Sequence, residues 1–242
     1  MLLYHSIGGG PLSTRTADFE QQMAWLSAHA KVVNLDTLLN QTNTGDLRVA
    51  ITFDDGYATL HQVALPVLQA FGFQPTVFLT SGMIDMSVPQ ASLTEQGHYP
   101  QESFLTWQQV DALIHHGWGV GCHGWKHLDG TAITIEEFRA NLTRCKATIE
   151  MHTGQSPDTV AFTWGHFNQR MLDEMASLEM RHAFSCIHGA ISYPLRQSKA
   201  IERIDIRPEL MIEDFEAIVR GDWDYLGMLQ YTRHLLRNRH VR

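Results

Sequence analysis

The sequence predicts an α/β fold whose parallel strands form a barrel. Short apolar runs alternate along the chain with stretches in which apolar residues recur every three or four positions, which is typical of strands joined by crossover helices. This alternation fits either a barrel or a doubly wound sheet, and about seven or eight strand–helix units in 242 residues favour the barrel. No internal repeat, low-complexity tract or linker interrupts the pattern, so we expect residues 1–242 to form one domain.

The first third of the chain alternates strands and helices, with glycine, proline or polar residues between them. In order, we expect a strand over 1–7, a helix from Thr16, a strand over 32–35, a short helix over 36–40, a strand over 49–53, a helix over 59–71 and a strand over 75–79. Gly82–Ser103 has no hydrophobic period and contains two prolines, so we interpret it as an excursion near a functional site.

The rest of the chain continues the alternation. We expect a helix from Thr106 to Gly117, a strand over 118–122, a helix from Thr134, a strand over 160–164, a helix over 168–180, strands over 183–187 and 201–206, and a mostly helical segment over 212–236 interrupted near Gly221. Thr134 and Glu137 have the spacing of a capping box, which marks the start of the longest of these helices.

Composition argues against several kinds of partner. The net charge is -8, so we expect no nucleic-acid partner. No apolar run approaches the roughly 18 residues of a membrane span, and the N-terminus lacks the regions of a signal peptide. We therefore expect a cytoplasmic protein, unless the chain is a truncated form of an exported one. Cys122, Cys145 and Cys186 are odd in number and widely spaced, which does not indicate a disulfide framework.

The most informative stretch is Val49–Tyr57, in which an apolar run leads into Asp54, Asp55 and Gly56. Desolvating two adjacent carboxylates costs on the order of several kcal/mol unless a cation or a proton compensates. Parallel α/β folds bind their ligands at the carboxyl ends of strands, where these acids would lie. The pair therefore indicates a functional site, and the alternative is an ordinary Asp-Asp-Gly turn.

Two histidines follow another expected strand. His123 and His127 are four residues apart and have glycines beside them. About one such pair is expected by chance among 14 histidines, so the position at a strand end matters more than the spacing. One carboxylate and two imidazoles leave positions open on a metal ion, and the second acid can then act as a base. The alternative is a pair of loop histidines without a ligand.

These two stretches together resemble motifs of the polysaccharide deacetylase (NodB-homology) family, carbohydrate esterase family 4. Ile51-Thr52-Phe53-Asp54-Asp55-Gly56 looks like its first motif, and His123-Gly124-Trp125-Lys126-His127-Leu128 resembles its second. The resemblance implies a distorted (β/α)7 barrel and a metal-dependent hydrolase that removes N-acetyl groups from an N-acetylated polysaccharide or oligosaccharide. It also implies that Asp54 is the catalytic base and that Asp55, His123 and His127 are the metal ligands.

The third motif of the family is altered in this chain. Val160–Asn168 occupies its place, but the usual arginine and proline are absent. The motif therefore lacks the arginine that usually partners the catalytic base and tunes its pKa. Trp164 in this stretch and Tyr57 after the first motif are the expected contacts to substrate. For Trp164, the alternative is a core aromatic at a strand end.

The opening of the chain offers the general acid. The family usually places a histidine near the C-terminus, and His234 is no convincing match. Leu2-Leu3-Tyr4-His5-Ser6-Ile7 instead resembles the start of the circularly permuted poly-N-acetylglucosamine deacetylases, in which an N-terminal histidine takes that role. His5 is therefore the candidate acid, and the alternative is a strand-end histidine bound to backbone.

The sequence thus predicts a hydrolase with a divalent metal ion, for which zinc is the first choice and cobalt, nickel or iron are possible. Two other functions remain open. The same centre could hydrolyse a non-sugar amide, or the barrel could bind carbohydrate without catalysis. We expect Cys122 to pack in the barrel wall and five further histidines to be surface or packing residues. These are His115, His116, His166, His182 and His188.

Overall fold

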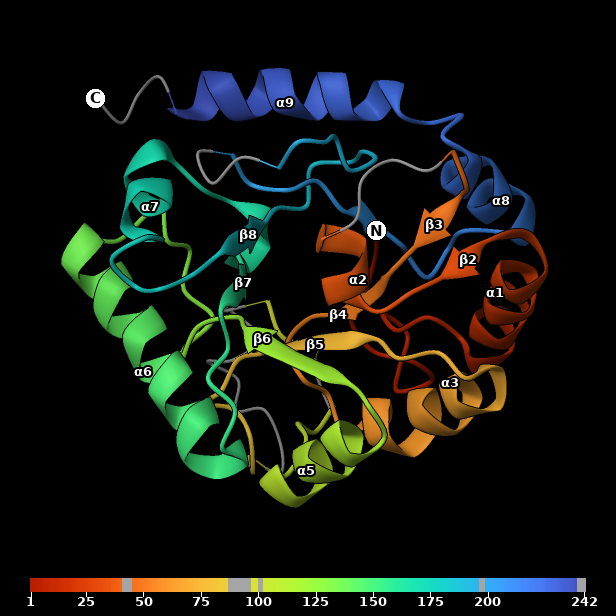
Figure 1. Ribbon diagram of the computed structural model, residues 1–242, viewed down its shortest axis with the longest axis horizontal. Coiled ribbons are helices and arrows are strands. Elements are labelled where there is room, and N and C mark those ends of the chain that lie inside the picture. The colour runs from red at the N-terminus through yellow and green to blue at the C-terminus, as the bar shows by residue number, and fades with distance from the viewer. Residues whose placement is uncertain (41–44, 87–96, 100–101, 196–198, 239–242) are drawn as a thin grey trace.

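Seven parallel strands form one curled sheet with helices around it (Figure 1). The computed structural model describes residues 1–40, 45–86, 97–99, 102–195 and 199–238. The strand order is β8-β7-β6-β5-β4-β1-β9. The bounds are β1 Leu2–Tyr4, β4 Ile51–Phe53, β5 Thr76–Leu79, β6 Gly119–Cys122, β7 Thr159–Ala161, β8 His182–Phe184 and β9 Ile204–Asp205. The predicted α/β barrel with seven parallel strands is confirmed.

The sheet curls until its two edges approach each other. Phe184 at the end of β8 forms a parallel bridge with Ile201, shortly before β9. Ser185 N–H donates to the carbonyl oxygen of Ile201 over 2.9 Å, and Ile201 N–H donates to that of Ala183 over 2.8 Å. The carboxyl ends of the strands therefore share one rim around the interior of the barrel.

Helices connect the strands. Their bounds are α1 Thr16–His29, α2 Leu35–Asn40, α3 Leu65–Phe71, α5 Trp107–His115, α6 Ile135–Thr153, α7 Gln169–Glu174, α8 Ile212–Arg220 and α9 Tyr225–Asn238. A π-helical turn over Leu60–Ala64 leads into α3. The capping box predicted for the longest helix is confirmed, because Thr134 Oγ1 accepts from Glu137 N–H and the Glu137 carboxylate accepts from Thr134 N–H.

One predicted strand lies outside the barrel. The strand expected over 32–35 is β2, Lys31–Val32, and it pairs with β3, Arg48–Val49, in a separate two-stranded sheet. Strand length does not decide this, since β9 also has two residues and joins the main sheet. Of the predicted excursion Gly82–Ser103, residues 87–96 and 100–101 lie outside the described residues.

Several other elements end earlier than expected, including β1, which stops at Tyr4, and β8, which stops at Phe184. The strand predicted over 160–164 stops at Ala161, because Trp164 has a left-handed φ of 60° inside a 3-10 turn over Thr163–Gly165. The helix predicted over 168–180 stops at Glu174. The shorter strand leaves Trp164 on the rim instead of in the sheet.

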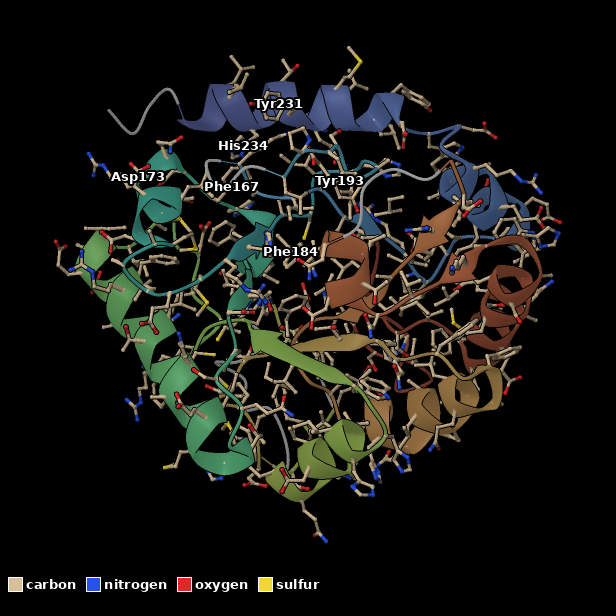
Figure 2. The ribbon with its side chains drawn as sticks, viewed as in Figure 1. Phe167, Asp173, Phe184, Tyr193, Tyr231 and His234 are labelled. Carbon is tan, nitrogen blue, oxygen red and sulfur yellow. The ribbon has the colours of Figure 1, made fainter. Side chains whose placement is uncertain are left out.

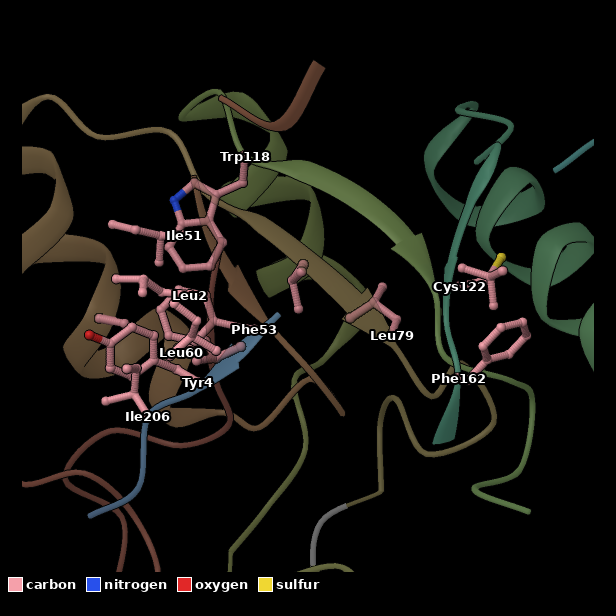
Figure 3. Packing of buried hydrophobic residues seen from close by; sticks show 14 of the residues in the cluster. Leu2, Tyr4, Ile51, Phe53, Leu60, Leu79, Trp118, Cys122, Phe162 and Ile206 are labelled. Carbon is pink, nitrogen blue, oxygen red and sulfur yellow. The ribbon is translucent and has the colours of Figure 1, made fainter. Parts of the chain in front are cut away.

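The core beneath the rim is formed by strands that are buried on both faces. All three residues of β4 are buried, as an almost continuous apolar run predicts. Figure 3 shows Leu2, Tyr4, Ile51 and Phe53 gathered in one cluster. The Phe53 ring stacks on Trp118, with the centroids 5.4 Å apart. This packing fixes the direction in which the chain leaves β4 at the rim.

Helix α9 runs along one side of the molecule (Figure 2). The His234 ring stacks on Phe167, with the centroids 4.1 Å apart. Gln230 Oε1 accepts from His188 N–H over 2.6 Å. No helix in the described part of the chain is long and apolar enough to cross a membrane.

Candidate metal centre and catalytic site

The turn that follows β4 carries both acids. Asp55 and Gly56 have left-handed φ values of 70° and 91°, and Gly56 N–H donates to the carbonyl oxygen of Asp54 over 2.9 Å. A Cβ atom at position 56 would lie 2.8 Å from the side chain of Leu79, so the turn requires glycine there. A left-handed aspartate is a strained conformation that clusters at functional sites. The turn gives the two adjacent carboxylates different partners.

Asp55 faces the two predicted histidines. Its Oδ1 lies 3.5 Å from His123 Nε2 and 3.5 Å from His127 Nε2. All three side chains are buried, and the three ligand atoms lie within 4.8 Å of one another. Atoms that bind one ion at about 2.1 Å stand roughly 3.4 Å apart in a tetrahedron. Asp55 Oδ1 is buried without a hydrogen-bond partner, so the donor set and its spacing fit a divalent cation.

The protonation states also suit a metal ion. His123 Nδ1 lies 2.8 Å from the carbonyl oxygen of Ala161, which can only accept, so this nitrogen carries the proton and Nε2 is left for a ligand. Burial lowers the pKa of His123 to about 4, which keeps the ring neutral. Burial raises the pKa of Asp55, but His127 and His123 oppose it and leave the value at about 2. The carboxylate is therefore ionised at neutral pH.

Asp54 forms a buried ion pair instead. Arg203 Nη1 and Nη2 donate to its two oxygens, each over 2.7 Å, and Arg203 Nε donates to the carbonyl oxygen of Ser185 over 3.0 Å. Arg203 is fully buried and Asp54 is 1% exposed. Burial raises the pKa of Asp54, but the charges of Arg203 and His123 outweigh it and hold the pKa below its usual value. Asp54 is thus a fixed, ionised carboxylate beside the candidate metal ligands Asp55, His123 and His127.

The sequence analysis did not predict a role for Arg203. The structure shows that this residue, and not one in the third motif, is the arginine that pairs with Asp54. The arginine comes from the segment that closes the barrel before β9, not from the stretch after β7. The sequence contains only a weak signal, because Arg203 lies in the strand predicted over 201–206 together with two other charged residues, Glu202 and Asp205. An arginine inside a buried strand needs a buried acid as its partner.

The other predicted residues lie around this centre at different depths. His5 follows β1 and is half-buried. It contributes to lowering the pKa of both Asp54 and Asp55, whereas burial raises the pKa of each. Trp164 is 46% exposed, and its ring lies 5.1 Å from that of His127. Tyr57 is fully buried, and its hydroxyl accepts from Tyr99 N–H over 2.8 Å. Trp164 is thus open to a substrate, whereas Tyr57 supports the rim from within.

A further histidine, His98, was also missed by the sequence interpretation. It is 2% exposed, and its Nδ1 lies 3.9 Å from Asp55 Oδ1. It belongs to the aperiodic stretch Gly82–Ser103, where neither strand nor helix spacing indicates which side chains point inward. His234, by contrast, packs on Phe167 in α9. Cys122 is fully buried, as expected.

This arrangement can support hydrolysis of an acyl bond. It combines a three-ligand site for a cation with an ionised carboxylate that the cation does not need. A half-buried imidazole stands on the same rim. A Lewis acid, a base and an acid at one strand-end rim are the groups that such a reaction requires.

Comparisons with known proteins agree with this interpretation. The model of the polysaccharide deacetylase family matches residues 41–183, more than half of the chain. The chain is 26% identical over 228 residues to YxkH of Bacillus subtilis (strain 168), which its name assigns provisionally to the polysaccharide deacetylases. That match covers 91% of this chain and 76% of YxkH.

Two further relatives extend the comparison. The chain is 30% identical over 105 residues to the poly-beta-1,6-N-acetyl-D-glucosamine N-deacetylase of Escherichia coli (strain K12), a match that covers 41% of this chain and 16% of that protein. Among solved structures, the Streptococcus pyogenes deacetylase PplD in complex with acetate superposes with a TM-score of 0.74. It is 20% identical, and the match covers 90% of this chain and 96% of that one, which establishes a shared fold.

Proposed function

Because the chain belongs to the polysaccharide deacetylase family, we propose that it is a metal-dependent hydrolase that removes N-acetyl groups from an N-acetylated polysaccharide or oligosaccharide and releases acetate. The observation that carries the proposal is the different environment of two adjacent acids. Asp54 pairs with Arg203, whereas Asp55 faces two imidazoles. In this proposal residues 1–242 act as a single catalytic domain.

Asp55, His123 and His127 hold the metal ion in this proposal. Zinc suits their nitrogen and oxygen donors best, and cobalt, nickel and iron are the alternatives. The bound ion supplies Lewis acidity, which lowers the pKa of water and polarises the amide carbonyl. His123 is already neutral and oriented by Ala161, so little rearrangement of its ring is needed to bind.

Asp54 is the general base. It takes a proton from water as the water attacks the amide carbon, and Arg203 keeps its carboxylate ionised and fixed in direction. His5 is the general acid, because an imidazolium on the same rim can donate its proton to the departing amine nitrogen. The oxygen of the water thus ends in acetate, and the amine nitrogen gains a proton as the carbon–nitrogen bond breaks.

The exposed ring of Trp164 supports a glycan as the substrate. It stands beside His127 at the edge of the centre, where its apolar face can pack on a sugar ring. The similarity to a deacetylase whose name gives poly-beta-1,6-N-acetyl-D-glucosamine as its substrate favours N-acetylglucosamine polymers. Their acetamido group is the amide that the centre would hydrolyse.

The test is acetate release from β-1,6-linked N-acetylglucosamine oligomers and from chitooligosaccharides by the zinc-loaded protein. Asp54→Asn should lower kcat at least about 100-fold, because removal of a positioned base costs that much or more. Asp111→Asn is the matched control, since Asp111 is exposed on α5 and should leave kcat unchanged.

Full activity of Asp54→Asn, or of the protein after chelation and metal-free dialysis, would contradict the mechanism. Glycan binding without acetate release would instead indicate a silent carbohydrate-binding barrel. Hydrolysis confined to non-sugar amides would identify an amidase.

A further inference from the structure

A third imidazole faces Asp55. The Nδ1 atom of His98 lies 3.9 Å from Asp55 Oδ1, the same oxygen that faces His123 and His127. The ring centroid of His98 lies 4.9 Å from that of His127. Asp55 is therefore surrounded by three histidine rings, although the sequence pattern accounts for only two of them.

Neither nitrogen of His98 has a hydrogen-bond partner in the structure as described, and both are buried. Burying an unsatisfied polar group costs about 1–3 kcal/mol. A buried histidine normally satisfies at least one nitrogen with a hydrogen bond, as His123 does on the carbonyl oxygen of Ala161. The unsatisfied nitrogens of His98 indicate a missing partner, and Asp55 Oδ1 lacks a partner at the same place.

The separation between His98 and Asp55 suits two ligands of one ion better than a hydrogen bond. A hydrogen bond would bring the two atoms to about 2.7–3.2 Å. Two atoms that each bind one ion at about 2.1 Å stand roughly 3–4.2 Å apart, depending on the angle between them. His98 is not among the three residues whose ligand atoms all lie within 4.8 Å of one another, so its ring has to move inward to bind.

Aromatic neighbours keep the backbone around His98 at the rim, close to Asp55. Its ring packs edge-on against Phe104, with the centroids 5.0 Å apart. Tyr99 stacks on Tyr57 at 5.1 Å and donates its N–H to the Tyr57 hydroxyl. On the other side Gly97 has a φ of +85°, and a Cβ there would lie 2.0 Å from the Trp164 ring. Residues on both sides of His98 are thus fixed against the rim.

We propose that His98 is a fourth protein ligand of the metal centre, which makes the donor set one carboxylate and three imidazoles. Water would then need a fifth position on the ion, which catalytic zinc sites can provide. This inference rests on the metal-dependent function proposed above and goes beyond the three ligands that the sequence motifs provide. It also gives Tyr57 a role, because the Tyr57–Tyr99 contact positions the backbone next to the ligand.

The test counts the imidazoles that bind zinc. Long-range 1H–15N spectra of zinc-loaded, 15N-histidine-labelled protein should show three zinc-bound rings in the wild type and two in His98→Gln. Chelator competition should show zinc binding at least about tenfold weaker in His98→Gln. His115→Gln, an exposed histidine at the end of α5, is the matched control and should change neither result.

The wild-type spectrum decides the question even if the variant does not fold. Two bound rings in the wild type overturn the inference about His98 and leave the deacetylase proposal intact, which acetate release tests separately. A third ring that disappears in His5→Gln instead of His98→Gln overturns it as well. Failure of the wild type to bind zinc, cobalt, nickel or iron overturns both the fourth ligand and the proposed metal centre.

Discussion

At the scale of single residues, the candidate site depends on a buried ion pair between distant parts of the chain. Asp54 and Arg203 are 149 positions apart, and neither is accessible to solvent. The desolvation of both charges is offset only while they remain paired by two hydrogen bonds. The pair therefore affects both the free energy of unfolding and the pKa of the proposed base, Asp54. A single substitution should reveal both effects.

Arg203→Met should lower the free energy of unfolding by about 3–5 kcal/mol, because it leaves a buried carboxylate without its partner. The pKa of Asp54 should rise, since burial raises it and Arg203 no longer opposes that effect. A base with a raised pKa stays protonated to higher pH, so the acid limb of the kcat/KM profile should move to higher pH. Denaturant unfolding and a pH–rate profile measure the two effects.

Two controls separate this pair from an ordinary salt bridge. Arg139→Met removes an exposed arginine that pairs with Glu174, and should cost no more than about 1 kcal/mol. The double variant Arg203→Met/Asp54→Asn should recover part of the lost stability, because the unpaired charge is gone. Equal costs for the two arginine variants, or an unmoved pH profile, would show that Arg203 does not act on the base.

The sequence predicts some residues of the site and not others for a physical reason. Asp54, Asp55 and His123 stand directly at strand ends, so the strand pattern alone brings them to one rim. Arg203 meets Asp54 only because the barrel closes through Ile201, and no local pattern encodes that closure. His98 lies in a segment without periodicity, so its inward position follows from packing against Phe104.

At the scale of elements, α6 holds the loop that carries the two histidines. The Asn141 side chain on α6 forms two hydrogen bonds with the backbone of Lys126, which lies between His123 and His127. Its Oδ1 accepts from Lys126 N–H over 2.8 Å, and its Nδ2 donates to the carbonyl oxygen of Lys126 over 3.1 Å. The Asn141 carbonyl oxygen also accepts from Trp125 N–H over 3.3 Å. A helix on the outer layer thus sets the spacing of two candidate ligands.

Asn141→Ala should weaken metal binding by about tenfold, because outer residues that orient ligands typically contribute this much. Chelator competition measures the affinity. Thr134→Ala is the control in the same helix, since it removes the N-cap and should cost about 1 kcal/mol of stability without changing the affinity. An unchanged affinity in Asn141→Ala, with reduced stability in both variants, would limit α6 to a structural role.

Sequence patterns predicted some element boundaries correctly and others incorrectly. The capping box at Thr134 is a local signal that needs no tertiary contact, and its prediction is confirmed. The strand expected over 160–164 was wrong at its end, because Trp164 takes a left-handed conformation that apolar alternation does not reveal. The error falls on the rim, where the chain departs from regular structure beside the candidate site.

At the scale of the whole molecule, the alternation of strands and helices was sufficient to predict a parallel sheet, because each crossover returns the chain to the same sheet. The number of strand–helix units then favoured a barrel. It could not show that β2 pairs with β3 outside that sheet. Both segments have strand-like sequences, and which sheet they join depends on the packing of the complete fold. The main rim is unaffected, since its acids and histidines follow β4 and β6.

Metal binding should stabilise the whole barrel, because the candidate ligands come from separate strand ends that unfolding would disperse. At a free zinc concentration 100 times Kd, the gain is about 2.7 kcal/mol, which corresponds to a rise in Tm of roughly 5–10 °C for a chain of this length. Calorimetry with and without a chelator measures the rise. Asp55→Asn should abolish most of it, whereas Asp54→Asn should retain it, because Asp54 pairs with Arg203 and not with the cluster. A Tm that depends on zinc equally in both variants would place the ion elsewhere on the molecule.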